Sequence, residues 1–115
     1  NLIKVFGSSP VVLQTYLSLG ELAANGNFTN KFREQLALSI GEENDCDYCL
    51  SAHTAIGKMN GLSEDQIIAS RKSEASDAKE QAGLVFAQSV TKNRGKVSGE
   101  ELKKVKEAGC TDEDI

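Results

Sequence analysis

A single proline, Pro10, occurs in the 115 residues of this chain, and this constrains the fold more than any other feature. Proline disrupts helix interiors, because it lacks a backbone N–H and its ring clashes with the preceding turn. Here it follows Ser9, a good N-terminal cap, and so occupies the first helical position, where proline is tolerated. No segment shows strand-like alternation bounded by hairpin turns. The sequence therefore predicts an all-α fold.

Six helices are expected from Pro10 onward, because apolar residues recur at helical spacing between recognisable start and stop signals. Two of these helices open with a capping box, in which a serine is followed three residues later by glutamine or glutamate, at Ser63–Gln66 and Ser98–Glu101. The expected helices cover about residues 10–24, 29–41, 45–60, 63–70, 78–92 and 98–108, with residues 71–77 as a polar connector.

Length and charge limit the possible partners. A chain of 115 residues corresponds to one domain, residues 1–115. Its 13 basic and 17 acidic side chains give a net charge of −4. We therefore expect neither nucleic acid nor an anionic membrane as a partner. No apolar run approaches the roughly 20 residues that a membrane-spanning helix needs.

The cysteine count bears on the cellular compartment. The chain has three cysteines, an odd number that does not fit the paired disulfides of a small secreted domain. A reducing compartment, the cytoplasm, is therefore expected. A disulfide in that compartment would be transient and catalytic.

One short pattern occurs twice. Residues 60–67 (NGLSEDQI) and 108–115 (AGCTDEDI) both pass from a glycine to a serine or threonine followed by acids, which favour a helix N-terminus. The sequence stops at Ile115, where the second copy would begin a helix, so we expect the domain to lack its C-terminal helix. Cys110 takes the place of Leu62, which favours a buried, apolar role for this cysteine.

Two cysteines and the only histidine lie together in residues 46–53 (CDYCLSAH). In a helix, Cys46, Cys49 and His53 fall within about 60° of one face. We expect Cys46 in the first turn, where free N–H groups and the helix dipole favour a thiolate. Cys49 and His53 are one turn apart, so the imidazole is placed to accept the thiol proton. This pattern is typical of dithiol redox chemistry.

Two other interpretations of this face remain open. A structural zinc site needs a fourth ligand, and Cys110 stands alone without a partner motif. The cysteines and His53 can also be ordinary core residues of a buried helix. We expect neither a metal nor another cofactor at this face.

Two nearby residues are candidates for proton transfer. Glu34 lies on the helix expected before the cysteines, and a short turn would pack these two helices as an antiparallel hairpin. Glu34 then faces the first turns of the cysteine helix, although an ordinary solvated carboxylate is the alternative. Tyr48, between the cysteines, can either donate a hydrogen bond to a thiolate or peroxide, or simply pack.

Together these residues resemble a known family. Glu34 is followed by Cys46-Asp-Tyr-Cys49, by Leu-Ser-Ala-His53 and by residues 61–67 (GLSEDQI). This pattern is similar to the alkylhydroperoxidase D-like proteins of the carboxymuconolactone decarboxylase superfamily, and the similarity covers about residues 30–115. The decarboxylase branch generally lacks the cysteine pair, so the name of the superfamily does not give the activity.

The resemblance implies a fold and a set of catalytic roles. It implies a helical bundle built around a helical hairpin, with the cysteine pair at the N-terminus of a central helix, and thiol-dependent peroxidase or disulfide reductase activity. Cys49 would attack the peroxide, Cys46 would resolve the intermediate, and His53 and Glu34 would relay protons. Tyr48 stands where some members have a histidine, which removes one candidate from the relay.

The resemblance also implies partners. The substrate would be a hydroperoxide, and a lipoyl-type or thioredoxin-type dithiol protein would reduce the resulting disulfide. Members usually assemble as homotrimers or homohexamers. The remaining alternatives are a non-catalytic oligomeric domain with structural or zinc-binding cysteines, and an acid–base enzyme that uses His53 and Glu34 without the thiols.

Overall fold

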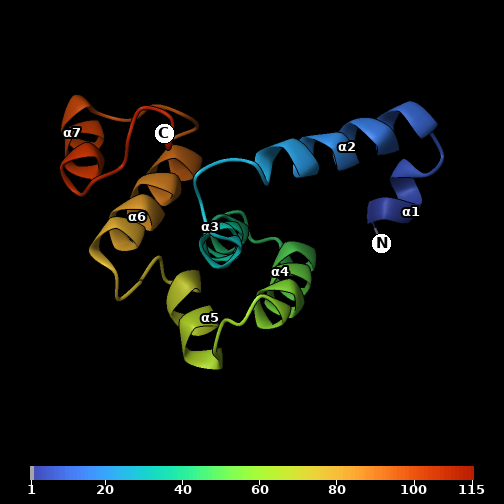
Figure 1. Ribbon diagram of the computed structural model, residues 1–115, viewed down its shortest axis with the longest axis horizontal. Helices are drawn as coiled ribbons and strands as arrows, with labels where there is room; N and C mark the ends of the chain where they lie inside the picture. Colours follow the sequence, from blue (N-terminus) through green and yellow to red (C-terminus); the bar gives the residue numbers. More distant parts are fainter. Residues whose placement is uncertain (1) are drawn as a thin grey trace.

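The computed structural model describes residues 2–115. These residues form seven helices and no strands (Figure 1). The helices are α1 (Leu2–Phe6), α2 (Pro10–Ala23), α3 (Asn30–Glu43), α4 (Asp47–Met59), α5 (Glu64–Arg71), α6 (Ala78–Lys92) and α7 (Gly99–Glu107). The predicted all-α fold is confirmed. The first helix, α1, was not predicted, because its five residues are too few to show a helical period.

Side-chain caps set the starts of the predicted helices. In α5, the Ser63 hydroxyl accepts from the Gln66 N–H while the Gln66 amide oxygen accepts from the Ser63 N–H, which completes the capping box. Ser98 and Glu101 form the same reciprocal pair at α7. Both predicted capping boxes are therefore confirmed.

The repeated pattern is also a repeated structure. Gly61 and Gly109 both have positive φ angles, +87° and +103°, which glycine adopts without strain. Leu62 and Cys110, the residues that follow them, are buried at 5% and 6% exposure, so the predicted burial of Cys110 is confirmed. Thr111 and Asp114 exchange backbone-to-side-chain hydrogen bonds of 2.9 and 3.3 Å, as Ser63 and its partner do. A helix beyond residue 115 stays a prediction.

Helix α3 lies at the centre of the molecule and packs against α4, α5 and α6 (Figure 1). The largest contact is with α4, which follows after a short turn and forms the expected helical hairpin with α3. Leu38 of α3, Leu62 and Ile67 form a buried apolar cluster, and Leu50 of α4 packs against it. Burial of these side chains, each contributing about 1.5–3 kcal/mol, holds α4 and α5 on α3.

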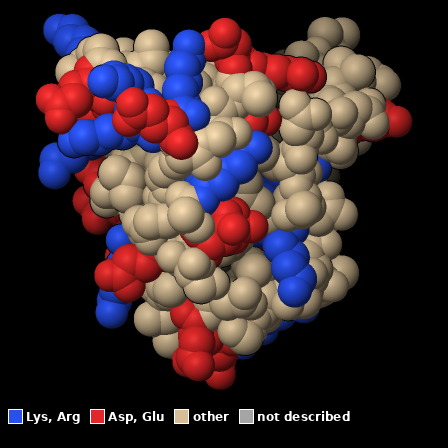
Figure 2. Space-filling view, turned by 60° about the vertical axis from the view of Figure 1, so that its left-hand side comes forward, with Lys and Arg blue, Asp and Glu red and all other residues tan. Residues whose placement is uncertain are grey.

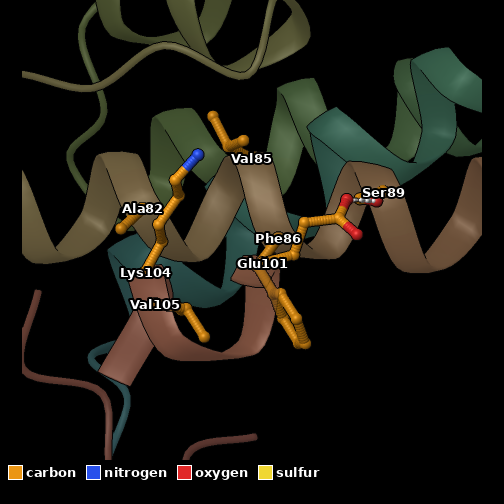
Figure 3. A pocket seen from close by; sticks show the side chains of 7 residues that line it. All are labelled: Ala82, Val85, Phe86, Ser89, Glu101, Lys104 and Val105. Atoms are coloured by element: carbon orange, nitrogen blue, oxygen red, sulfur yellow. Dashed lines mark hydrogen bonds between the residues drawn. The ribbon is translucent and has the colours of Figure 1, made fainter. Parts of the chain in front are cut away.

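Helix α7 packs on α6 through apolar and polar contacts. Figure 3 shows the Glu101 carboxylate turned toward the Ser89 hydroxyl, which donates a hydrogen bond to it. Hydrogen bonds from Ser89 and Ser98 lower the pKa of Glu101 to about 2. Beside this contact, Val85, Phe86 and their neighbours line a largely apolar cavity of about 230 Å³. The cavity is separate from the cysteine pair, so it is not the candidate site.

Helix α2 is the least packed part of the molecule. None of its residues is buried, and it contacts mainly α1. The rings of Phe6 and Tyr16 pack edge to face there, with their centroids 5.1 Å apart. Six large apolar side chains of α2 are exposed, namely Val11, Val12, Tyr16, Leu17, Leu19 and Leu22. An apolar surface of this extent on one helix is typical of an interaction surface.

Charged side chains are distributed without a dominant sign on the face that Figure 2 shows, where lysine and arginine alternate with aspartate and glutamate. None of the described helices is both long and apolar enough to cross a membrane.

Candidate active site

The start of α4 differs from the prediction by two residues. Asp45 has a positive φ of +50°, which breaks the helical path before the first cysteine. Helix α4 therefore begins at Asp47, and Cys46 is its N-cap rather than a residue of its first turn. The Cys46 sulfur accepts a hydrogen bond from the Cys49 N–H at 3.2 Å. This sulfur thus satisfies a backbone N–H that would otherwise lack a partner at the start of the helix.

The two cysteines of the pair are joined. Cys46 and Cys49 form a disulfide with their Cα atoms 5.2 Å apart, and both residues are half-buried. The third cysteine, Cys110, is a free buried thiol, and burial raises its pKa. Because a raised pKa reduces the thiolate fraction, Cys110 is not suited to attack a substrate. The redox-capable sulfurs are therefore those of the pair.

His53 is bonded to a carboxylate of the neighbouring helix. Its Nδ1 lies 2.8 Å from Oε2 of Glu34, one turn beyond Cys49 on α4. Glu34 therefore faces α4, as the sequence predicted, and is largely shielded, with 15% of its side chain exposed against 35% for His53. A carboxylate on Nδ1 fixes the orientation of the ring and holds a proton on that nitrogen, which leaves Nε2 as the acceptor.

Two glycines allow α3 and α4 to approach each other at this pair. A Cβ on Gly57, which is buried, would lie 3.0 Å from Cδ1 of Leu62 and 3.7 Å from Cβ of Glu34. A Cβ on Gly41 would lie 3.4 Å from Cβ of Cys49. Sequence analysis missed both residues, although a glycine inside a helix is itself a signal of close packing. The close approach brings Glu34 within reach of α4.

Replacing Gly57 with alanine tests this packing. Alanine favours a helix over glycine by about 1 kcal/mol. At Gly57, however, the added methyl must displace buried Leu62, and overpacking of this kind costs about 1–3 kcal/mol. We expect Gly57→Ala to be neutral or destabilising in urea unfolding of the full chain. The matched control is Gly20→Ala in α2, where a Cβ meets no atom within 4 Å. A Gly57→Ala chain that gains as much stability as the control would contradict close packing.

A cavity of about 280 Å³ lies beside one cysteine of the pair. Cys49 and His53 line it, whereas Cys46 and Glu34 do not, so the carboxylate acts on the cavity only through the histidine. The remaining wall is mostly apolar and includes Leu2 and Ile3 of α1, Tyr16 of α2, and Tyr48, Ala52 and Ile56 of α4. The cavity is therefore lined by one cysteine and one histidine beside an apolar surface.

Helix α1 covers part of this cavity. The Leu2 N–H donates a hydrogen bond of 3.1 Å to the Tyr48 hydroxyl oxygen, which leaves the phenolic proton free to be donated elsewhere. Tyr48 is 50% exposed and lines the cavity, so the structure places it at the site rather than in the core. Sequence analysis missed the contribution of α1, because this helix was not expected.

Metal binding was one alternative for these residues. Within residues 2–115, no group of three or more histidine, cysteine, aspartate or glutamate side chains is arranged to hold a metal ion.

Comparison with known proteins identifies the family. The sequence model of the carboxymuconolactone decarboxylase family matches residues 10–89, which include Glu34, Cys46, Cys49 and His53. The chain belongs to the carboxymuconolactone decarboxylase family. This family includes the alkylhydroperoxidase D-like proteins, so the predicted superfamily is confirmed. Members of the carboxymuconolactone decarboxylase family include enzymes, and the cysteine spacing of this chain is the one expected from the resemblance.

A relative from Haemophilus influenzae shares part of the sequence. It is described as an uncharacterized protein and is 44% identical over 45 residues. The match covers 38% of this carboxymuconolactone decarboxylase family chain and 40% of the relative. The matched segment spans less than half of the relative's length, and the description of the relative names no activity.

Proposed function

We propose that this protein is a thiol-dependent peroxidase that reduces hydroperoxides through its cysteine pair. The observation that carries the proposal is the Cys46–Cys49 pair at the start of α4, with Cys49 in the same cavity as His53 and with Glu34 bonded to that histidine. A dithiol, an acid–base group and an orienting carboxylate are the parts that such a reaction needs.

In the first step, the Cys49 thiolate attacks the terminal oxygen of the hydroperoxide. A sulfur–oxygen bond forms, the O–O bond breaks, and the alkoxide leaves with a proton as an alcohol. Cys49 is oxidised to a sulfenic acid. We assign the attack to Cys49 rather than Cys46 because only Cys49 lines the cavity.

In the second step, the Cys46 thiolate attacks the sulfur of the sulfenic acid. The disulfide forms and hydroxide leaves, which becomes water on protonation. The sum is two thiols and one hydroperoxide converted to one disulfide, one alcohol and one water. A dithiol carrier of the lipoyl or thioredoxin type would then reduce the disulfide by thiol–disulfide exchange.

His53 and Glu34 would move the protons of both steps. His53 accepts the proton of the Cys49 thiol and returns it to the leaving oxygen. Glu34 would stabilise the imidazolium that exists between these two transfers, because its carboxylate lies 2.8 Å from Nδ1. A carboxylate held at this distance favours a positive neighbour through Coulomb attraction.

The wall of the cavity supports an organic hydroperoxide as the substrate. Leu2, Ile3 and Ile56 can contact an apolar group that hydrogen peroxide lacks. The exposed apolar side chains of α2 support the homotrimer or homohexamer that the family resemblance implies, which sedimentation of the full chain would measure.

A titration of the reduced full chain tests the proposed activity. One equivalent of cumene hydroperoxide should remove the mass of two hydrogens per chain, release one equivalent of the alcohol and leave the Cys110 thiol free. Cys46 and Cys49 should be joined in the peptide map. A chain that keeps all three thiols after complete exposure to the hydroperoxide would overturn the proposal. One bound zinc per reduced chain would instead favour the alternative, a non-catalytic domain with zinc-binding cysteines.

A further inference from the structure

A second polar cavity, of about 350 Å³, lies between α3, α5 and the loop of residues 72–77. It shares no lining residue with the cavity at Cys49. Four of its polar lining residues come from three segments of the chain, namely Gln35, Asp65, Glu74 and Ser76. The peroxidase reaction uses none of them.

Gln35 is the unusual residue of this cavity. It is only 3% exposed, yet its side-chain amide has no hydrogen-bond partner among residues 2–115. No fully buried side-chain nitrogen or oxygen of the described chain lacks a partner, so the amide must reach the cavity surface. At that surface the amide can hydrogen-bond only to water or to a bound ligand. A ligand with N–H donors would supply hydrogen bonds that the protein itself does not make to this amide.

The loop that forms the opposite wall is held in place. The Ser73 hydroxyl is hydrogen-bonded to the buried Ser39 hydroxyl at 2.8 Å. The Gln81 amide donates to the Ser73 carbonyl at 2.9 Å and accepts from the Ala75 N–H at 2.7 Å. Glu74 between them donates its N–H to the Ala69 carbonyl at 2.9 Å. The cavity is therefore largely pre-formed, as ligand sites usually are.

The charge of the cavity indicates the class of ligand. Asp65 and Glu74 are carboxylates, and neither belongs to an ion pair within the described residues. The residues that line the cavity include no lysine, arginine or histidine. The lining thus presents two negative charges together with the amide of Gln35 and the hydroxyl of Ser76. A cation with several hydrogen-bond donors matches this set.

From the unpartnered amide and the two carboxylates, we infer that this cavity binds a guanidinium group. A guanidinium has five N–H donors in one plane, so it can bond a carboxylate and the Gln35 carbonyl oxygen together. An ammonium would satisfy the same charge with fewer donors in fixed directions. The group belongs either to a free small molecule or to an arginine side chain of a partner protein.

Titration of the ¹⁵N-labelled full chain, followed by NMR, tests the inference. The probes are agmatine, as a free guanidine, and Nα-acetyl-arginine amide, as an arginine within a polypeptide. The neutral isostere Nα-acetyl-citrulline amide is the control ligand. We expect saturable shifts at the Gln35 side-chain amide and at the Glu74 and Ser76 backbone amides. A charge-assisted pair should make arginine amide at least about tenfold tighter than citrulline amide. Tighter agmatine indicates a small molecule, and tighter arginine amide indicates a partner protein.

Variants separate the cavity from general surface charge. Glu74→Gln, at an exposed position, should weaken the tighter probe about tenfold, whereas Glu113→Gln, an exposed carboxylate outside the cavity, should leave its affinity unchanged. Gln35→Leu should have at least the effect of Glu74→Gln. No saturable shift with either guanidine, equal binding of citrulline amide, or equal losses in Glu74→Gln and Glu113→Gln would overturn the inference.

Discussion

Replacing Cys49 with serine is expected to abolish hydroperoxide turnover, a loss of at least about 10³-fold in kcat/KM. The serine hydroxyl is nearly isosteric with the thiol but does not ionise near neutral pH, so the cavity loses its nucleophile. The measurement is consumption of cumene hydroperoxide by the full chain with excess dithiothreitol. Unchanged turnover would contradict the assignment of Cys49.

The other cysteine of the pair should behave differently. Cys46→Ser leaves the attacking sulfur in the cavity but removes the group that resolves it. We expect a single stoichiometric turnover without a reductant, after which the Cys49 sulfenic acid persists and can be trapped by dimedone, with the adduct located by mass spectrometry. If the Cys46→Ser variant forms no trappable sulfenic acid and turns over hydroperoxide as fast as the unaltered chain, the assignment of Cys46 as the resolving cysteine is wrong.

Cys110 supplies the matched control. Because it is buried, carries a raised pKa and lies outside the cavity at Cys49, Cys110→Ser should keep full activity. A chain that lacks all three cysteines and still converts a substrate through His53 and Glu34 would instead support acid–base chemistry, the remaining alternative within the family.

Replacing Glu34 with glutamine is the second large expected effect. Glutamine keeps the size of the side chain and a hydrogen bond to His53 Nδ1, but it removes the charge that stabilises the imidazolium. General acid–base assistance is worth about 10²–10⁴-fold, so we expect kcat/KM to fall about 10²-fold while the Cys46–Cys49 disulfide still forms under stronger oxidants. Stopped-flow measurement of thiol oxidation against peroxide concentration gives this rate.

A neighbouring carboxylate controls for charge alone. Glu43→Gln, at the last residue of α3, removes the same charge from the same helix, and Glu43 is not the carboxylate that bonds His53. The rate of the Glu43→Gln variant should change less than about threefold, as expected for a half-buried charge that forms no ion pair within residues 2–115. His53→Asn should match Glu34→Gln or exceed it, and the double variant should lose little more, because both act through one imidazole. Additive losses would contradict a shared relay.

Local chemistry in the sequence made most of the fold predictable. A capping box acts within four residues, so Ser63–Gln66 and Ser98–Glu101 marked the starts of α5 and α7 correctly. The spacing of one turn between Cys49 and His53 is also a local property. The meeting of Glu34 with His53 was predictable because a short turn between two helices leaves few ways to pack them.

The rest depended on contacts that no local pattern records. Sequence analysis placed Cys46 inside α4, and the positive φ of Asp45 displaced the helix start. The role of Gly57 became clear only once Leu62 and Glu34 were seen against it. The covering of the cavity by α1 arises from a contact between Leu2 and Tyr48, 46 residues apart. The cavity at Gln35 likewise forms only where α3, α5 and the loop of residues 72–77 come together.

The α3–α4 hairpin also bears on how the protein matures. Glu34 and His53, the outermost residues of the proposed relay, lie 19 positions apart, with both cysteines between them. Contacts of such short sequence separation form early, because closing a small loop costs little entropy. We therefore expect the proposed redox centre to assemble as the hairpin leaves the ribosome, before α6 and α7 are synthesised. A nascent chain of this kind would carry an oxidisable dithiol while its core is still incomplete.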